Sequence, residues 1–289
     1  MLDRKMKWYH KLFIYVVLCA IGFVLFAPFM YMISISLAGK QTNAVQNFSF
    51  FPKEFYWQNY RTLFGNMFGG EYPIGTWFLN TLFVVVLSII GQMWSSSFVA
   101  YGFAKMQYKH KNGFFLLLLT TMMLPGQITL IPVFIIFRNL GLYNTLWPLI
   151  IPQFFGSAYN IFFTRQFMTA IPGELYEAAE LDGLNYCGSY RKSVLPLVRP
   201  ALEAIASCTL NWAWGDLMGP LMYVSDSSKF TLALGAANLS AATNPSGTIN
   251  TSLVMALSFC LSIPQIVIYF WGQKYLFNLN LGLGNSGSK

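Results

Sequence analysis

Charged residues are scarce in this sequence of 289 residues. Only 10% are Asp, Glu, Lys or Arg, whereas 55% are hydrophobic and 18% are aromatic. A soluble domain carries about 25% charged residues, so this chain has too few to cover a surface that faces water. The composition indicates a protein of the lipid bilayer, and it excludes a disordered chain, which would need high charge and few apolar residues.

Cysteine and histidine are also rare, with four and two residues. The cysteines have no metal-ligand or redox spacing, so we expect neither a disulfide framework nor a metal site. The sequence contains no GxxxxGK[ST] phosphate loop, no HExxH motif and no Ser/His/Asp arrangement. We therefore expect a chain that is not an enzyme, binds no cofactor of its own and depends on a partner for any energy from ATP.

Long uncharged runs supply enough apolar sequence for several membrane-spanning helices. A transmembrane helix needs about 20 mainly apolar residues. The predicted helices cover residues 12–38, 72–104, 112–137, 139–164, 201–222 and 250–272. The first run is too long for a signal-peptide core and lacks a small-residue cleavage pattern, so we count it as a helix. The predicted fold is an all-α integral membrane protein, with six transmembrane helices in one domain of residues 1–289.

The positive charges set the predicted orientation. With the N-terminus inside, thirteen of the 18 Lys and Arg residues lie on the cytoplasmic side, as the positive-inside rule requires. Both termini are then cytoplasmic, the long external connections cover about 39–76 and 223–249, and the long internal connection covers about 165–199. Topology accounts for the net charge of +8, so nucleic acid is not an expected partner.

The internal connection contains a short acidic helix. It starts after Pro172, and Gly183 favours a left-handed end. Its acids stand where the helix dipole favours anions: Glu174, Glu177 and Glu180. One interpretation is an amphipathic helix at the lipid headgroups. An anionic inner leaflet repels carboxylates, however, and the small Ala178 and Ala179 suit close approach to a protein, so we favour a protein-docking helix.

The same segment carries a pattern found in a known family. Glu177-Ala178-Ala179, then Asp182-Gly183 and Leu195-Pro196, resembles the EAA loop of permease subunits in binding-protein-dependent ABC importers. Further strings resemble the MalG-like, sugar-importing branch of that family: Phe51-Pro52-Lys53, Asn59-Tyr60, Asn80-Thr81, Ala100-Tyr101, Met123 to Pro132, Gly141-Leu142, Asn144-Thr145, Asn211-Trp212 and Pro220-Leu221. The tail LGLGNSGSK departs from the usual ending of the family.

The resemblance implies a role for the acidic helix and a set of partners. The coupling residues would dock on a separate ATPase subunit: Glu177, Ala178, Ala179, Asp182 and Gly183. Two ATPase subunits would bind ATP and Mg²⁺, beside a second, MalF-like permease and an external solute-binding protein, in a bacterial inner membrane. The cargo would be a sugar or oligosaccharide moved by alternating access. We expect Glu177 to be the most sensitive acid, with Glu174 and Glu180 solvated.

Two further groups are weaker candidates. Polar and aromatic residues of the helix 201–222 could line a substrate path, although tryptophan also packs at membrane interfaces: Asn211, Trp212, Trp214 and Asp216. Asp216 fits either a solvated cavity or the outer interface. Resemblance alone places Thr243, Asn244 and Pro245 in a loop that contacts the binding protein.

An ion-gradient-driven secondary transporter is the alternative function. Such a protein needs inverted repeats and midplane carboxylates, and Asp216 is the one plausible candidate in this sequence. Near the cytoplasmic end of the same helix, Glu203 lies one turn after Arg199, so it is expected either to reach water or to pair with that arginine. The identity of the sugar stays open, because selectivity resides largely in the binding protein.

Overall fold

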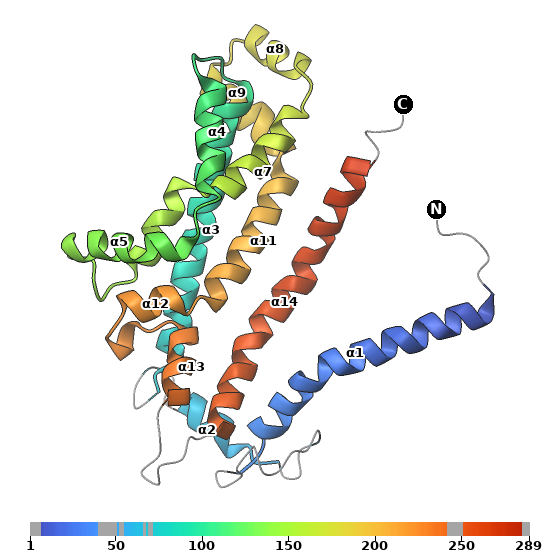
Figure 1. Ribbon diagram of the computed structural model, residues 1–289, viewed down its shortest axis with the longest axis vertical. Coiled ribbons are helices and arrows are strands. Elements are labelled where there is room, and N and C mark those ends of the chain that lie inside the picture. Colours follow the sequence, from blue (N-terminus) through green and yellow to red (C-terminus); the bar gives the residue numbers. More distant parts are fainter. Residues whose placement is uncertain are drawn as a thin grey trace. The chain divides into compact units, whose positions relative to one another are not determined.

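The computed structural model describes residues 7–39, 51, 55–65, 68, 72–241 and 251–284, and within these ranges the chain forms helices and no strands (Figure 1). The predicted all-α class is confirmed. The chain divides into two compact units, Met1–Ile74 with Ala236–Ile263 and Gly75–Gly235 with Pro264–Lys289. Each unit is described by itself.

The first unit is built on α1 (Trp8–Ser36), α2 (Gln58–Gly65) and the start of α14 (Thr251–Gly284). The Asn59 amide is buried and donates to the carbonyl oxygens of Ser36 and Ala38, both at 2.9 Å. The hydroxyls of Tyr60 and Ser36 are 2.7 Å apart. These bonds satisfy carbonyls at the end of α1 and fix α2 against it, which gives the Asn59-Tyr60 string a structural reason.

The second unit is organised around the 32-residue helix α3 (Ile74–Lys105). Its further elements follow in chain order: α4 (Lys111–Thr121), α5 (Gly126–Asn139), α6 (Trp147–Ile150), a 3₁₀ turn (Ile151–Phe155), α7 (Ala158–Thr169), α8 (Glu174–Leu181), α9 (Tyr186–Ser189), a π-helix (Tyr190–Val194), α10 (Leu195–Leu197), α11 (Arg199–Gly215), α12 (Met218–Tyr223), a 3₁₀ turn (Ser227–Lys229) and the start of α13 (Leu232–Ala241). From Ala236 on, α13 belongs to the first unit. A core cluster joins α3, α7 and the segment from the π-helix into α11, with Ala100, Tyr101 and Met168 at its centre.

Some helices have the length and composition needed to cross a membrane. Among the described residues these are α1 and α3, and the number rises to four if each bent pair is one span. The pairs are α4 with α5, bent by 96°, and Tyr186–Leu197 with α11, bent by 75°. An apolar composition indicates that a segment can lie inside the membrane, but it does not show whether the segment is one unbroken helix. The count of six remains a prediction.

Four predicted elements differ from the observed ones. Residues 112–137 form two helices, α4 and α5, which are bent by 96° at a break that contains Pro125. Residues 139–164 do not form one helix: Gly141, Asn144 and Gly156 have positive φ, and α7 begins only at Ala158. The predicted helix 201–222 is interrupted at Asp216, between α11 and α12. Part of the predicted external loop 223–249 is helical, because α13 is rich in alanine and leucine, which have high helix propensity.

The string Asn144-Thr145 marks one of these interruptions. Asn144 adopts a left-handed conformation with φ 59°, which asparagine tolerates better than most residues. Its side-chain oxygen accepts hydrogen bonds from the backbone N–H groups of Ser225 and Asp226 at 3.1 and 3.0 Å. Its carbonyl oxygen accepts one from Lys229 Nζ at 3.0 Å. The residue therefore ties the connection after α5 to the connection after α12.

Candidate functional site

The acidic helix α8 (Glu174–Leu181) has defined ends at the positions that its sequence predicts. Gly183 has φ +75°, its N–H donates to Glu180 O at 2.9 Å, and Leu184 N–H donates to Ala179 O at 3.0 Å. This pair of bonds is a Schellman motif, which requires a left-handed residue after the helix. The predicted left-handed conformation of Gly183 is confirmed.

The two faces of α8 have different surroundings. Ala179 is 4% exposed, and Tyr176, one turn earlier, packs against the core cluster. Ala178 and Glu177 are exposed, and Leu181 is 89% exposed. The expectation that Ala179 shares a docking face with Ala178 is therefore corrected, because Ala179 follows Tyr176 by three residues and lies on the inner face. The outer face keeps Leu175, Ala178 and Leu181 available to a partner.

Lys105, the last residue of α3, holds α8 in place. Its ammonium lies 3.7 Å from the centre of the Tyr176 ring, and Nζ donates to Ile171 O at 3.2 Å. A cation–π contact of this kind contributes about 0.5–1 kcal/mol at exposed sites. Burial raises the pKa of Tyr176, whose enclosed hydroxyl has no hydrogen-bond partner in the described part of the chain. The helix is therefore attached to the end of α3 through its inner face.

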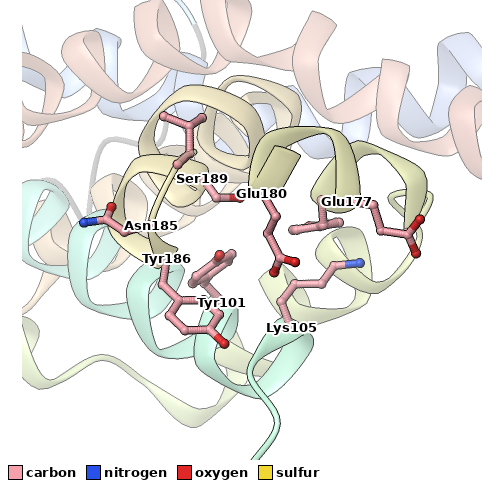
Figure 2. A pocket seen from close by; sticks show the side chains of 10 residues that line it. Tyr101, Lys105, Glu177, Glu180, Asn185, Tyr186 and Ser189 are labelled. Carbon is pink, nitrogen blue, oxygen red and sulfur yellow. The ribbon is translucent and has the colours of Figure 1, made fainter. Parts of the chain in front are cut away.

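A recess of about 570 Å³ lies between this end of α3 and the segment from α8 to α9. Lys105, Glu177 and Glu180 line it together with the hydroxyl side chains of Tyr101 and Tyr186 (Figure 2). Glu174 is not part of its wall. The recess thus offers both signs of charge and several hydroxyls to a group that enters it. It places Glu180 with Glu177, whereas the sequence grouped Glu180 with Glu174.

A series of short helices leads from α8 to α11. The side chain of Asn185 accepts a hydrogen bond from Gly188 N–H at 2.8 Å and starts α9. The π-helix follows, and the Tyr190 hydroxyl lies 2.7 Å from Ser97 Oγ of α3. After a bend of 75° the chain continues as α11. Displacement of α8 can therefore reach α11 through packed helices without crossing a long loop.

The structure separates the four substrate-path candidates of the helix 201–222. Trp212 is 56% exposed, and the neighbouring Asn211 is exposed as well. Trp214 is 3% exposed and packs edge to face on Phe78, with ring centres 5.9 Å apart. The carboxylate of Asp216 accepts a hydrogen bond from Gly219 N–H, in the first turn of α12, at 3.2 Å. Only Asn211 and Trp212 share an open face.

Two other expectations have simple outcomes. Arg199 Nε and Glu203 Oε1 form an ion pair at 3.0 Å, so the predicted pair is confirmed. Thr243, Asn244 and Pro245 lie outside the described residues. Within the described part of the chain, no group of three His, Cys, Asp or Glu side chains is placed to hold a metal ion.

Three amides that the sequence did not single out meet near Trp212. Gln92 of α3, Gln153 of the 3₁₀ turn and Asn160 of α7 are joined by hydrogen bonds of 2.8 and 3.0 Å. Each stands inside an apolar run. An uncharged polar side chain in such a run was the signal available, but nothing in the sequence showed that the three would meet.

These features define a multi-pass membrane protein in which a short acidic helix, α8, packs at one end of the 32-residue helix α3. A comparison with protein families gives the particular class: the model of the binding-protein-dependent transport system inner membrane component matches residues 97–277. The chain belongs to this family and is a multi-pass protein of the inner membrane. The matched region contains α8, its recess and two of the three amides, Gln153 and Asn160.

Similar proteins agree with this assignment. The arabinooligosaccharides transport system permease protein AraQ of Halalkalibacterium halodurans is 32% identical over 69% of this chain and 70% of its own length. The polygalacturonan/rhamnogalacturonan transport system permease protein YtcP of Bacillus subtilis is 27% identical over 91% of this chain and 93% of its own. A chain in the crystal structure of a bacterial ABC transporter involved in alginate import has a TM-score of 0.81 at 22% identity. The match covers 94% of this chain and 99% of the chain from the alginate transporter, and the two chains have the same fold.

Proposed function

We propose that this chain is a permease subunit of an ABC importer that takes up a sugar or oligosaccharide delivered by an external binding protein. The observation that carries the proposal is the family match over residues 97–277, which include the acidic helix α8. The names of similar permeases, for arabinooligosaccharides and for polygalacturonan and rhamnogalacturonan, support a saccharide as cargo. The proposed assembly contains a second permease and two ATPase subunits, which bind ATP and Mg²⁺.

In this proposal α8 is the coupling helix. Its exposed apolar residues, Leu175, Ala178 and Leu181, would contact an ATPase subunit, while Glu177 and Glu180 offer carboxylates to cations at the rim of the contact. Burial of apolar residues with charges around them is typical of specific protein interfaces. The Lys105–Tyr176 contact attaches α8 to α3, and the Schellman motif fixes the end of α8, so α8 would move together with α3.

Closure of the ATPase dimer would then pull on α8 and tilt α11. The link is the helical path through α9 and the π-helix, which Tyr190 and Ser97 connect to α3. Because α11 carries Asn211 and Trp212 on an open face, tilting it would alter the surface that lines the membrane passage. This is alternating access, with the energy supplied by the partners.

A secondary transporter is not favoured by the geometry. Asp216 was the carboxylate that such a mechanism would use for ion coupling, but it accepts a backbone N–H in the first turn of α12. A carboxylate that satisfies a free N–H at a helix start has a structural role.

The coupling role is tested by alanine substitution at two glutamates of the same helix. Glu177→Ala should loosen ATPase co-purification and lower uptake, because removing one member of a desolvated charge pair costs about 2–5 kcal/mol. Glu174→Ala is the matched control, since Glu174 is exposed and does not line the recess. Uptake and ATPase co-purification are measured for both variants. Equal, small losses would remove Glu177 from the coupling residues.

The proposed orientation places α8 in the cytoplasm and the connection after α12 outside. Cys187 is exposed beside α8, and Ser227 is exposed in that connection. Two proteins with a single cysteine each are compared: one keeps only Cys187, and the other has only the cysteine of Ser227→Cys. An impermeant thiol reagent applied to intact spheroplasts should label the second protein and leave the first unmodified. Labelling of Cys187 in intact spheroplasts, without labelling at position 227, would reverse the topology.

A further inference from the structure

A buried amide cluster lies near the middle of α3. The side chain of Gln92 is 5% exposed, and that of Asn160 is 9% exposed. Gln92 Nε2 donates to Gln153 Oε1 at 2.8 Å, while Gln92 Oε1 accepts from Asn160 Nδ2 at 3.0 Å and from Ser157 N–H at 3.2 Å. Gln92 thus fixes the orientation of the amides that come from the 3₁₀ turn and from α7.

The cluster forms one wall of an open cavity of about 300 Å³. Trp212, Thr209 and Cys208 of α11 form the opposite wall. Cys208, Asn211 and Trp212 are exposed on one face of α11, because residues three and four apart lie on the same side of a helix. The volume lies at the lower end of the range of ligand sites, about 300–1,000 Å³.

The depth of the cavity in the membrane limits the surroundings that its amides can have. Gln92 lies well inside α3, a helix long and apolar enough to cross the bilayer. Amides that open towards lipid would leave polar groups without partners, so such groups face a water-filled passage or another protein. An open cavity with a polar wall at this depth therefore faces a solvated passage or a partner protein, and the labelling of Cys208 described below distinguishes the two.

The polar atoms of the cluster are not all used within the chain. Among the described residues, no group donates to Asn160 Oδ1. Gln153 Nε2 has one weak bond, to Leu149 O at 3.4 Å. An amide nitrogen carries two donors and an amide oxygen two acceptor sites. A fixed acceptor and a fixed donor beside an open indole are thus available to a ligand.

We propose that the cavity between Gln92, Gln153, Asn160 and Trp212 binds one neutral saccharide unit of the transported sugar. A sugar hydroxyl both donates and accepts, so it can bond to Asn160 Oδ1 and Gln153 Nε2 together. The C–H face of a pyranose or furanose ring can pack on the exposed indole of Trp212. No charged side chain lines the cavity, so it offers nothing to balance a uronate carboxylate.

This inference rests on the proposed function and adds that this chain itself contacts the cargo. It is tested in the complete transporter, with its partner permease, ATPases and binding protein, in proteoliposomes. The neutral probes are labelled arabinotriose, maltotriose and cellotriose, and the acidic probe is trigalacturonate. Trp212→Ala should lower uptake of a transported neutral probe below saturation roughly three- to tenfold, as expected for the loss of one good contact.

The control is Trp94→Ala. Trp94 is 58% exposed on α3 and is not part of the cavity wall, so the two variants remove the same side chain at nearly the same exposure. Trp94→Ala should retain uptake, and Trp212→Phe, which keeps a flat ring, should lose less uptake than Trp212→Ala. ATPase co-purification should be equal for Trp212→Ala and Trp94→Ala, because α8 is unchanged in both, so a loss of uptake confined to Trp212→Ala is not a loss of assembly.

Cys208 supplies a second measurement that does not depend on Trp212. With Cys19, Cys187 and Cys260 replaced by serine, the transported neutral probe should slow maleimide labelling of Cys208 in the assembled transporter, and trigalacturonate should not. If Trp212→Ala fails to assemble, this protection decides the question. Unchanged uptake in Trp212→Ala together with unprotected Cys208 would overturn the site, and transport of trigalacturonate alone would overturn the neutral class. If the unmodified transporter neither imports nor responds to any sugar that its binding protein binds, the proposed function fails, and the site fails with it.

Discussion

Replacing Gly235 by alanine should destabilise the second unit strongly. A Cβ atom at this position of α13 would stand within 2.6 Å of Trp77 Cδ2, closer than van der Waals contact allows. The indole cannot easily withdraw, because Trp77 is 3% exposed and its Nε1–H donates to Ser227 O at 2.8 Å. Overpacking of this kind costs about 1–3 kcal/mol. The apparent melting temperature of the purified protein in detergent should fall by several degrees.

Gly102→Ala provides the matched control for this substitution. Gly102 lies within α3, and a Cβ atom there would meet nothing within 4 Å. Alanine is favoured over glycine in a helix interior by about 0.5–1 kcal/mol, so this variant should melt at the same temperature or higher. Equal melting temperatures for the two variants would show that Trp77 can move aside and that the close approach of α13 is not required.

The parts of the fold that sequence predicted are those that depend on local composition. The long apolar helices α1 and α3 follow from uncharged runs, and the left-handed end of α8 follows from Gly183. The interruptions of the other runs were missed. No charged residue interrupts the run 139–164, yet hydrogen bonds to distant segments hold Asn144 in its turn. Such bonds depend on tertiary structure and leave no periodic signal.

In the candidate site, too, the sequence predicted the features that depend on neighbouring residues and missed those that depend on tertiary contacts. The acidic helix was recognisable because its acids, small residues and terminal glycine are close in sequence. The facing of Ala179 was wrong, since it depends on the packing of Tyr176 against a core built from α3 and α7. The amide cluster escaped notice because Gln92 is 61 residues from Gln153 and 68 from Asn160.

Gly183→Val should uncouple ATP hydrolysis from transport. Valine at φ +75° is strained by roughly 1–2 kcal/mol, which disfavours the native end of α8 about five- to thirtyfold. The bonds from Gly183 N–H to Glu180 O and from Leu184 N–H to Ala179 O would weaken, and α9 would leave its present angle to α8. Stimulation of the ATPases by sugar-loaded binding protein should fall severalfold in the reconstituted transporter.

The side chain itself cannot explain such a loss, because a Cβ atom at Gly183 would meet nothing within 4 Å. The conformation of the backbone is therefore what the substitution tests. Gly183→Asn is the matched variant, since asparagine adopts the left-handed conformation more readily than β-branched residues do. It should keep most of the stimulation, with ATPase co-purification unchanged in both variants. If valine and asparagine reduce stimulation equally, the turn after α8 does not transmit the motion, and the path to α11 must begin at the contact between Lys105 and Tyr176 instead.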